Sequence, residues 1–147
     1  MLISDIMTAN VISIPITMSL AEARRTMDVY RVKHLPVVDK EKLVGIVTRR
    51  ALEKAGPSEL TTFSKQELNY LLNRLTVKEV MSRELVTISP DAAVEEAVVL
   101  ARLNKTRSFL VMDNNRLTGI VTNSDFFYRV LKPMLDVKEP SAGVLVH

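Results

Sequence analysis

The chain carries one pattern twice, in register and without a gap, at a spacing of 74 residues. Met7 aligns with Met81 (81 − 7 = 74), and Asp39 aligns with Asp113. The run Gly-Ile-Val-Thr at 45–48 aligns with the same run at 119–122. Two copies of one supersecondary unit predict a pseudo-two-fold assembly, in which each copy covers the apolar face that its partner leaves open. We therefore expect a ligand site in the cleft between the two halves.

The periodicity of each copy predicts the order strand, helix, strand, strand, helix, so we expect an α/β fold of two βαββα repeats packed with pseudo-two-fold symmetry. The capping pattern Ser19-Leu-Ala-Glu22 opens the first long helix. In the second copy a helix is predicted over 123–136, where Pro133 favours a kink or an earlier stop. The predicted domains are a first repeat over 1–54, a linker with a helix over 55–76, a second repeat over 77–131 and a tail over 132–147 that resembles the start of a further domain.

The linker holds its own helix, which begins at a second capping box, Ser64-Lys-Gln-Glu67. Its leucines form an apolar stripe at helical spacing: Leu68, Leu71, Leu72 and Leu75. We expect such an apolar stripe to pack against another apolar surface. It either ties the two halves together or offers a groove to a partner.

The composition excludes several classes of protein. An apolar fraction of 47% with 25% charged residues is ordinary for a soluble globular protein, and the start has no signal-peptide pattern. No apolar run reaches the roughly 18 residues of a membrane span. The formal charge of +3 is small for a nucleic-acid binder, although Arg24, Arg25, Arg49 and Arg50 leave that alternative open. We predict a cytoplasmic protein that does not bind a membrane.

Residues suited to catalysis or to metal binding are scarce. The chain has no cysteine, two histidines and four glycines. It has no nucleophile elbow, no metal-ligand spacing and no glycine-rich phosphate loop. We therefore predict that the protein is not an enzyme, binds no metal and requires no cofactor.

One corner of the second copy has the residues of a ligand site. The run Gly119-Ile-Val-Thr122-Asn-Ser-Asp125 leads from a strand into a helix. Gly119 leaves room for a ligand or a neighbouring backbone, and the oxygens of Thr122 and Asp125 can converge on a vicinal diol such as a ribose. The same spacing is typical of a capping box that only holds the helix. The two roles are compatible, and the residues alone leave both open.

The repeat resembles the CBS domain, named after cystathionine β-synthase. The matching stretches in the first copy are Asp5-Ile-Met-Thr8, His34-Leu-Pro-Val-Val-Asp39 and the run at 45–48; their mates in the second copy are Glu79-Val-Met-Ser82, Phe109-Leu-Val-Met-Asp113 and the run at 119–125. The resemblance spans about residues 1–131. The interrupting helical linker is similar to that of the acetoin-utilisation (AcuB-like) group of bacterial CBS-pair proteins.

The resemblance implies a regulatory module that binds an adenine nucleotide or a related adenosyl ligand, such as AMP, ATP or S-adenosylmethionine, and signals by a conformational change. It assigns the ribose to Thr122 and Asp125. Cationic phosphate contacts fall on Lys33, His34, Arg50 and Arg107, and the adenine slot on Thr87, Ile88 and Leu110. Solvated surface is the alternative for the cations, and a plain strand-edge position is the alternative for His34.

The first copy departs from this pattern, because Ala51 stands where the second copy has Asp125 (125 − 74 = 51). A site that loses a hydrogen-bond acceptor binds a hydroxyl roughly ten- to a hundredfold more weakly. We expect one nucleotide per chain. The same departure favours the alternative function, a structural dimerisation module that binds no small molecule. The resemblance also implies a homodimer, with the helices over 19–31 and 92–104 in its interface and an unknown regulated protein as a further partner.

Overall fold

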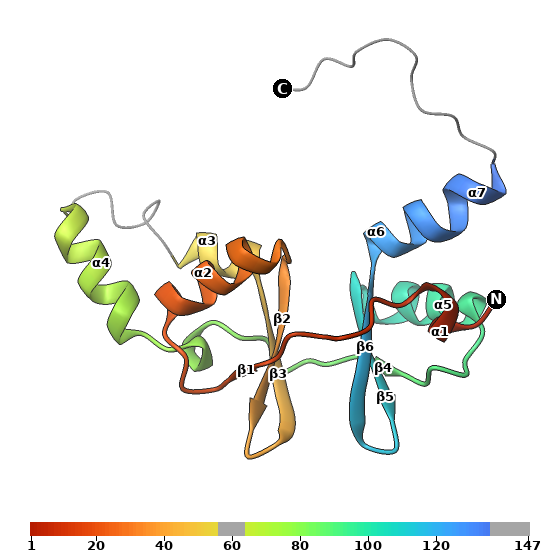
Figure 1. The fold of residues 1–147 in the computed structure, drawn as a ribbon, viewed down its shortest axis with the longest axis horizontal. Coiled ribbons are helices and arrows are strands. Elements are labelled where there is room, and N and C mark those ends of the chain that lie inside the picture. Colours follow the sequence, from red (N-terminus) through yellow and green to blue (C-terminus); the bar gives the residue numbers. More distant parts are fainter. Residues whose placement is uncertain (56–63, 136–147) are drawn as a thin grey trace, which may run out of the picture. The chain divides into compact units, whose positions relative to one another are not determined.

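The structure is a computed structural model that describes residues 1–55 and 64–135. The chain divides into two compact units (Figure 1). The first-repeat unit runs from Asn10 to Leu85, and the second-repeat unit joins the segment Met1–Ala9 to the chain from Val86 onward. Each unit is built on one three-stranded sheet with the same strand order. The prediction of two βαββα repeats is confirmed.

The sheet of the first-repeat unit has the order β1-β2-β3, with β1 parallel to β2 and β2 antiparallel to β3. Its strands are β1 (Ile14–Pro15), β2 (His34–Asp39) and β3 (Lys42–Thr48), and its helices are α2 (Leu20–Tyr30), α3 (Arg49–Lys54) and α4 (Lys65–Arg74). The first long helix starts where the capping pattern predicts, because the Ser19 hydroxyl accepts the N–H of Glu22 at 3.1 Å. Leu20, Ala23 and Met27 of α2 then pack on Leu35 and Val37 of β2.

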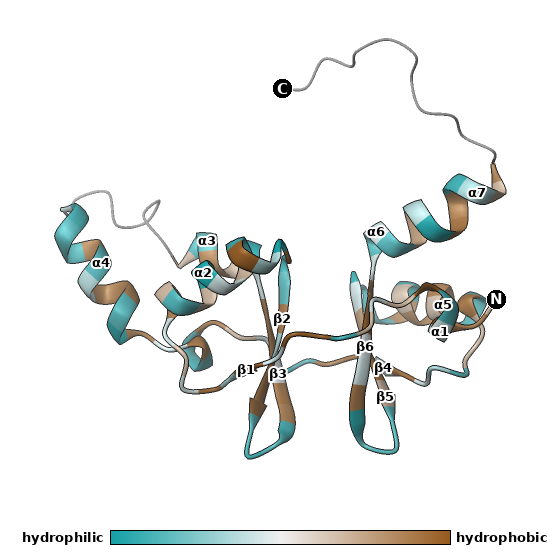
Figure 2. Ribbon diagram, viewed as in Figure 1, coloured by the Kyte–Doolittle hydropathy of each residue, from teal (hydrophilic) through white to brown (hydrophobic). Residues whose placement is uncertain are grey.

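The second-repeat unit repeats this topology, with the strand order β4-β5-β6. Its strands are β4 (Thr87–Ile88), β5 (Ser108–Asp113) and β6 (Arg116–Thr122), and its helices are α1 (Ile3–Ile6), α5 (Val94–Asn104), α6 (Asn123–Asp125) and α7 (Lys132–Met134). The hairpin turns of both units place two residues in the left-handed region, Lys40 and Glu41 in one and Asn114 and Asn115 in the other. Figure 2 shows these turns as polar tips on apolar strands.

The two units exchange short segments of chain. Ile3 and Ile6 of α1 precede the first repeat, but they lie in the core of the second-repeat unit, 0% and 1% exposed. Val77 opens the second repeat, but it is buried in the core of the first-repeat unit. Each core is therefore completed by the residues that introduce the other repeat.

A methionine and a glycine hold each exchanged segment against its sheet. A Cβ on Gly119 would lie 3.2 Å from Cβ of Met7 and would collide with its sulfur, and a Cβ on Gly45 would lie 2.6 Å from the sulfur of Met81. Backbone bonds between Thr8 and Ile120, and between Ser82 and Ile46, fix the same two places. The space that Gly119 opens, expected for a ligand or a neighbouring backbone, is occupied by Met7 of the chain itself.

The helix after β6 departs from an ordinary α-helix. A π-helical stretch covers Phe126–Leu131 between α6 and α7, and the helical run ends at Met134. This end falls two residues before the predicted one (136 − 134 = 2). The run passes through Pro133, which lies inside α7, and stops one residue after it, so the helix ends earlier than predicted but not at the proline.

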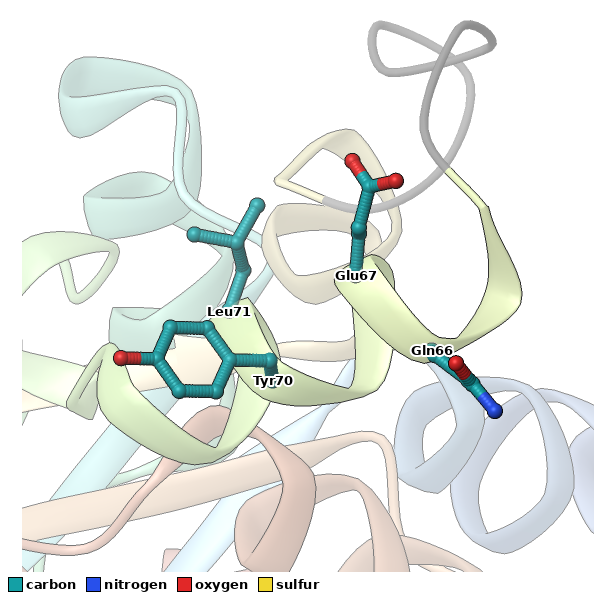
Figure 3. Close-up of a pocket in the computed structure, with 4 residues that line it drawn as sticks. All are labelled: Gln66, Glu67, Tyr70 and Leu71. Atoms are coloured by element: carbon teal, nitrogen blue, oxygen red, sulfur yellow. The ribbon is translucent and has the colours of Figure 1, made fainter.

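Leu72 of the linker's leucine stripe packs within its own unit, whereas Leu71 lines a surface depression and Leu75 is exposed. Helix α4 contacts α2, and Leu72 lies against the core of the first-repeat unit. Ser64 caps this helix as predicted, accepting the N–H of Glu67 at 3.2 Å. The outer face of α4 carries a depression of about 290 Å³, lined by Gln66, Glu67, Tyr70 and Leu71 (Figure 3). The expectations for residues 56–63 and 136–147 lie outside the described residues.

Candidate functional site

The corner at Thr122 and Asp125 forms where β6 passes into α6. The N–H of Thr122 donates to Oδ2 of Asp125 at 2.9 Å, which is the back-bond of a capping box. Asp125 is 7% exposed, and it is the one charged side chain classed as buried among the described residues. A buried carboxylate needs partners for both of its oxygens. The capping role considered for this pair is therefore present in the structure.

Within the part of the chain that the structure describes, the second oxygen of this carboxylate has only distant partners. The hydroxyl of Thr8 donates to Oδ1 of Asp125 at 3.4 Å, and Nε of Arg129 lies 3.6 Å from the same atom. A short charge-assisted hydrogen bond would span about 2.7–2.9 Å, so both contacts are weak. One carboxylate oxygen is thus fixed by the backbone, while the other is held loosely enough to change partners.

The first repeat shows what the corner does without its carboxylate. The hydroxyl of Thr48 accepts the N–H of Ala51 at 3.1 Å and caps α3. A threonine alone is sufficient to start the helix at this corner. Because the cap does not require an aspartate, the buried charge of Asp125 calls for a second explanation beyond helix capping.

The candidate adenine residues fall on two sides of the second sheet. Thr87 is the register partner of Leu110, and Ile88 is the register partner of Val111. Ile88 and Val111 belong to the core that the helices cover. Since side chains alternate along a strand, Thr87 and Leu110 face the opposite side of the sheet. The structure thus brings these two together and places Ile88 in the core.

The candidate cationic residues lie beside the two corners. Ser108, which follows Arg107, is the register partner of Thr122 in the second-repeat unit. In the first-repeat unit His34 is the register partner of Thr48, and the carbonyl of Lys33 accepts the N–H of Arg49 at 2.9 Å. The second-repeat unit therefore groups Thr87, Leu110, Arg107, Thr122 and Asp125, and the first-repeat unit groups Lys33, His34 and Arg50.

Burial lowers the pKa of His34 below its ordinary value of 6.5, and the positive charge of Lys33 lowers it further. The unfolded chain therefore binds more protons than the folded one between the lowered pKa and about 6.5. Stability is complete above pH 6.5 and is lost as the pH falls through the lowered pKa. We predict that acid lowers the melting temperature of wild type in this window, and that His34→Gln flattens the dependence. Lys33→Gln is the control and should reduce the slope only in part; equal slopes in all three proteins would contradict the assignment.

Two negative findings concern the described residues. Within residues 1–55 and 64–135, no group of three His, Cys, Asp or Glu side chains is placed to hold a metal ion. No helix in this part of the chain is long and apolar enough to cross a membrane.

Sequence comparison places these units in a known family. The model of the CBS domain matches residues 3–57 and again residues 77–132. The chain belongs to the CBS domain family, as a tandem pair. A CBS domain-containing protein of Dictyostelium discoideum is 30% identical over 138 residues, which cover 90% of this chain and 95% of that protein.

Solved structures share the fold over nearly the whole chain. The acetoin utilization protein (AcuB) of Vibrio cholerae matches with a TM-score of 0.72 and 27% identity, covering 95% of this chain and 98% of the other. The CBS domain pair of protein MJ0100, solved with 5′-methylthioadenosine and S-adenosylmethionine, matches with a TM-score of 0.73 and 28% identity over 91% and 98% of the two chains.

Several curated relatives are enzymes, and these match this chain over a small part of their own length. The A-adding tRNA nucleotidyltransferase of Geobacter sulfurreducens is 30% identical over 122 residues, which are 83% of this chain but 12% of that enzyme. The inosine-5′-monophosphate dehydrogenase of Korarchaeum cryptofilum is covered over 21% of its length. The similarity to these two enzymes is therefore confined to the part of each that corresponds to the CBS pair.

Proposed function

We propose that this CBS pair is a regulatory module, without enzymatic activity of its own, that binds an adenosyl ligand through Thr122 and Asp125. The observation that supports this proposal most is the buried carboxylate of Asp125, whose Oδ1 atom has only the long contacts to Thr8 and Arg129. A ribose diol offers two hydroxyl donors at the spacing of one carboxylate. A similar CBS pair has been solved with two adenosyl compounds, 5′-methylthioadenosine and S-adenosylmethionine.

The adenine ring is proposed to lie on the side of the second sheet that carries Thr87 and Leu110. These residues face away from the core that the helices cover. Thr87 is exposed, whereas Leu110 is only 2% exposed, so the ring would reach Leu110 by displacing the side chains that cover it. Arg107 immediately precedes β5 and would meet a phosphate if the ligand carries one, as AMP and ATP do. Lys33, His34 and Arg50 belong to the first-repeat unit, and their part in binding stays a prediction for substitution experiments.

The first repeat is proposed to bind the ligand weakly. Its corner keeps Thr48 but has Ala51 in place of the acceptor, and the hydroxyl of Thr48 is already used by the helix cap. A ribose there would meet no carboxylate. We therefore expect one strong site per chain.

The experiment that tests this function measures thermal stabilisation by adenosyl ligands. Wild type is melted with AMP, ATP, S-adenosylmethionine and 5′-methylthioadenosine, and again with 3′-deoxyadenosine, which lacks one hydroxyl of the diol. A ligand at a hundredfold excess over its Kd stabilises the folded state by about 2.7 kcal/mol. We predict a shift with at least one ligand that carries the diol. Asp125→Asn is expected to weaken its binding roughly ten- to a hundredfold.

Asp113→Asn is the matched control, because Asp113 lies exposed at the end of β5 and the substitution removes the same charge. It should leave the ligand shift unchanged. Calorimetric titration of the wild type should give one site per chain. If no adenosyl compound at millimolar concentration stabilises the wild type, the proposal is wrong.

A homodimer is proposed alongside ligand binding, and it is the function that remains if no ligand binds. Helix α5 buries Val94 and Ala97 in the core, but Val98, Val99 and Leu103 on the same helix are 57%, 57% and 73% exposed. Exposed apolar residues that gather on one helix normally mark an interaction surface. Helix α2 likewise exposes Val29 and Tyr30 near its end. These exposed apolar residues favour a second copy of the chain as the partner.

A further inference from the structure

The cluster Thr8, Asp125 and Arg129 joins the proposed ribose carboxylate to the exchanged N-terminal segment. Arg129 reaches in two directions at once. Its Nε atom faces Oδ1 of Asp125 at 3.6 Å, while its Nη1 atom donates to the carbonyls of Ile6 and Met7 at 3.2 and 3.0 Å. Those two carbonyls lie where α1 ends. One side chain thus touches the candidate ligand acceptor and the end of the segment Met1–Ala9.

The geometry of arginine makes these two contacts depend on each other. The guanidinium is planar, and its N–H groups point in fixed relative directions. A movement that brings Nε closer to Oδ1 must also move Nη1 relative to the carbonyls of Ile6 and Met7. Thr8 adds a second link, since its hydroxyl faces Oδ1 of Asp125 while its backbone N–H bonds to the carbonyl of Ile120 at 2.9 Å.

The first repeat shows that this cluster is not needed to hold such a segment. Its equivalent positions carry Ser82 for Thr8 (82 − 74 = 8), Ala51 for Asp125, and Ala55 for Arg129 (129 − 74 = 55). The backbone bonds between Ser82 and Ile46 nevertheless form at 2.9 and 3.0 Å, and Met81 packs on Gly45. Ser82 keeps a hydroxyl, but both charged members of the cluster are replaced by alanine in the first repeat.

From this we infer that Arg129 is a coupling residue: it competes with a ligand diol for Oδ1 of Asp125, and its hold on Ile6 and Met7 transmits the outcome to the segment Met1–Ala9. When a diol takes Oδ1, the hydroxyl of Thr8 and the guanidinium lose that partner, and the end of the segment is held less firmly. Binding and segment docking are then linked reciprocally. The inference rests on the proposed function for its ligand, but the cluster itself is testable without one.

The first test uses ligand-free protein and hydrogen exchange at the amides of Met7 and Thr8. Both amides are hydrogen-bonded in the structure, to the carbonyls of Ile3 and Ile120. Arg129→Met keeps an apolar stem and removes every donor. A partly exposed ion pair contributes little, so we expect Arg129→Met and Asp125→Asn each to raise exchange about two- to fivefold. The double variant should exchange no faster than the more affected single variant, because both changes break the same link.

Arg116→Met is the matched control, since Arg116 is an exposed arginine at the start of β6 in the same unit, and it should leave these amides unchanged. Effects of Arg129→Met and Asp125→Asn that multiply in the double variant would overturn the coupling, as would no effect of either. This arm decides the inference whether or not a ligand is found.

The second test adds 5′-methylthioadenosine, which carries the diol and no phosphate. We expect it to raise exchange at Thr8 in wild type while the strands β5 and β6 become better protected. Arg129→Met should bind it about two- to fivefold more tightly and show no ligand response at Thr8. Wild type that binds without any change at Thr8 would overturn the coupling and leave the proposed function standing. Wild type that does not bind would count against the proposed function alone.

Discussion

A chain that begins at Asn10 is expected to lose the folded second-repeat unit while it keeps the first-repeat unit. The deletion removes Ile3 and Ile6 from a core in which both are almost fully buried. It also removes the backbone bonds between Thr8 and Ile120, and Met7 from the face of Gly119. Truncating one buried isoleucine costs about 2–5 kcal/mol, and a small domain is stable by only about 5–15 kcal/mol. Losing the whole segment exceeds what the unit can tolerate.

Hydrogen exchange resolved by segment is the measurement. Strands β5 and β6 should lose their protection, whereas β2 and β3, which take no core residue from the segment Met1–Ala9, should retain theirs. A peptide with the sequence of residues 1–9, added at millimolar concentration, should restore protection in part. The same peptide with Ile3 and Ile6 changed to serine should not.

A single substitution also tests whether the segment Met1–Ala9 stabilises the second-repeat unit, with a smaller expected effect than the deletion. Ile6→Ala should lower the free energy of unfolding of the second-repeat unit by about 2–5 kcal/mol. Val77→Ala is the mirror control, since it should lower the stability of the first-repeat unit instead. Ser4→Ala, at an exposed position of α1, should change neither. Full protection of β5 and β6 in the chain that begins at Asn10 would contradict the exchange of segments.

Leu103→Glu is expected to convert the proposed homodimer into a monomer. Leu103 is 73% exposed on α5, beside the exposed Val99 one turn earlier. Burying a leucine stabilises an interface by about 1.5–3 kcal/mol, and a glutamate in its place would lose this and leave an unpaired charge in an apolar interface. In an interface between identical copies, the change would occur twice. We expect the dissociation constant of the dimer to rise at least a hundredfold.

Sedimentation equilibrium at micromolar concentration is the measurement, with circular dichroism to show that the fold is kept. Arg102→Glu is the matched control, because it brings a glutamate to the neighbouring exposed position without removing an apolar side chain. The Arg102→Glu variant should still sediment with the mass of a dimer. A monomeric wild type would refute the homodimer directly, whatever the variants do.

The repeated pattern was sufficient to predict the fold, because each copy carries its own strand, turn and capping residues. Ser19 and Ser64 cap their helices as predicted, and the hairpins turn at the expected polar residues. The exchange of segments between the two units could not be predicted from the sequence pattern. Met7 and Met81 are equivalent, and so are Gly45 and Gly119, so either methionine would fit either glycine. Only the path of the chain in three dimensions decides which pair forms.

The candidate site was predictable to a similar extent. Thr122 and Asp125 are three residues apart, and a helix start brings such a pair together by local geometry alone. Thr8 lies 117 residues from Asp125 in sequence, so no local pattern relates them. Arg129 was not among the predicted site residues, although it stands one helical turn after Asp125 and this spacing could have indicated an ion pair. Its contact with Ile6 and Met7 again depends on the exchanged segment.

The exchanged segment also sets the order in which the molecule can be assembled on the ribosome. Residues 1–9 emerge before the repeats that follow them, but the strands that cover Ile3 and Ile6 end only at Thr122. At about 5–20 residues per second, roughly 5–25 seconds of translation separate the two. Once Leu85 has been made, the first-repeat unit has every residue of its own core, while Ile3 and Ile6 are still without the strands that cover them. The first-repeat unit can therefore fold before the second-repeat unit, although the second-repeat unit contains the segment Met1–Ala9.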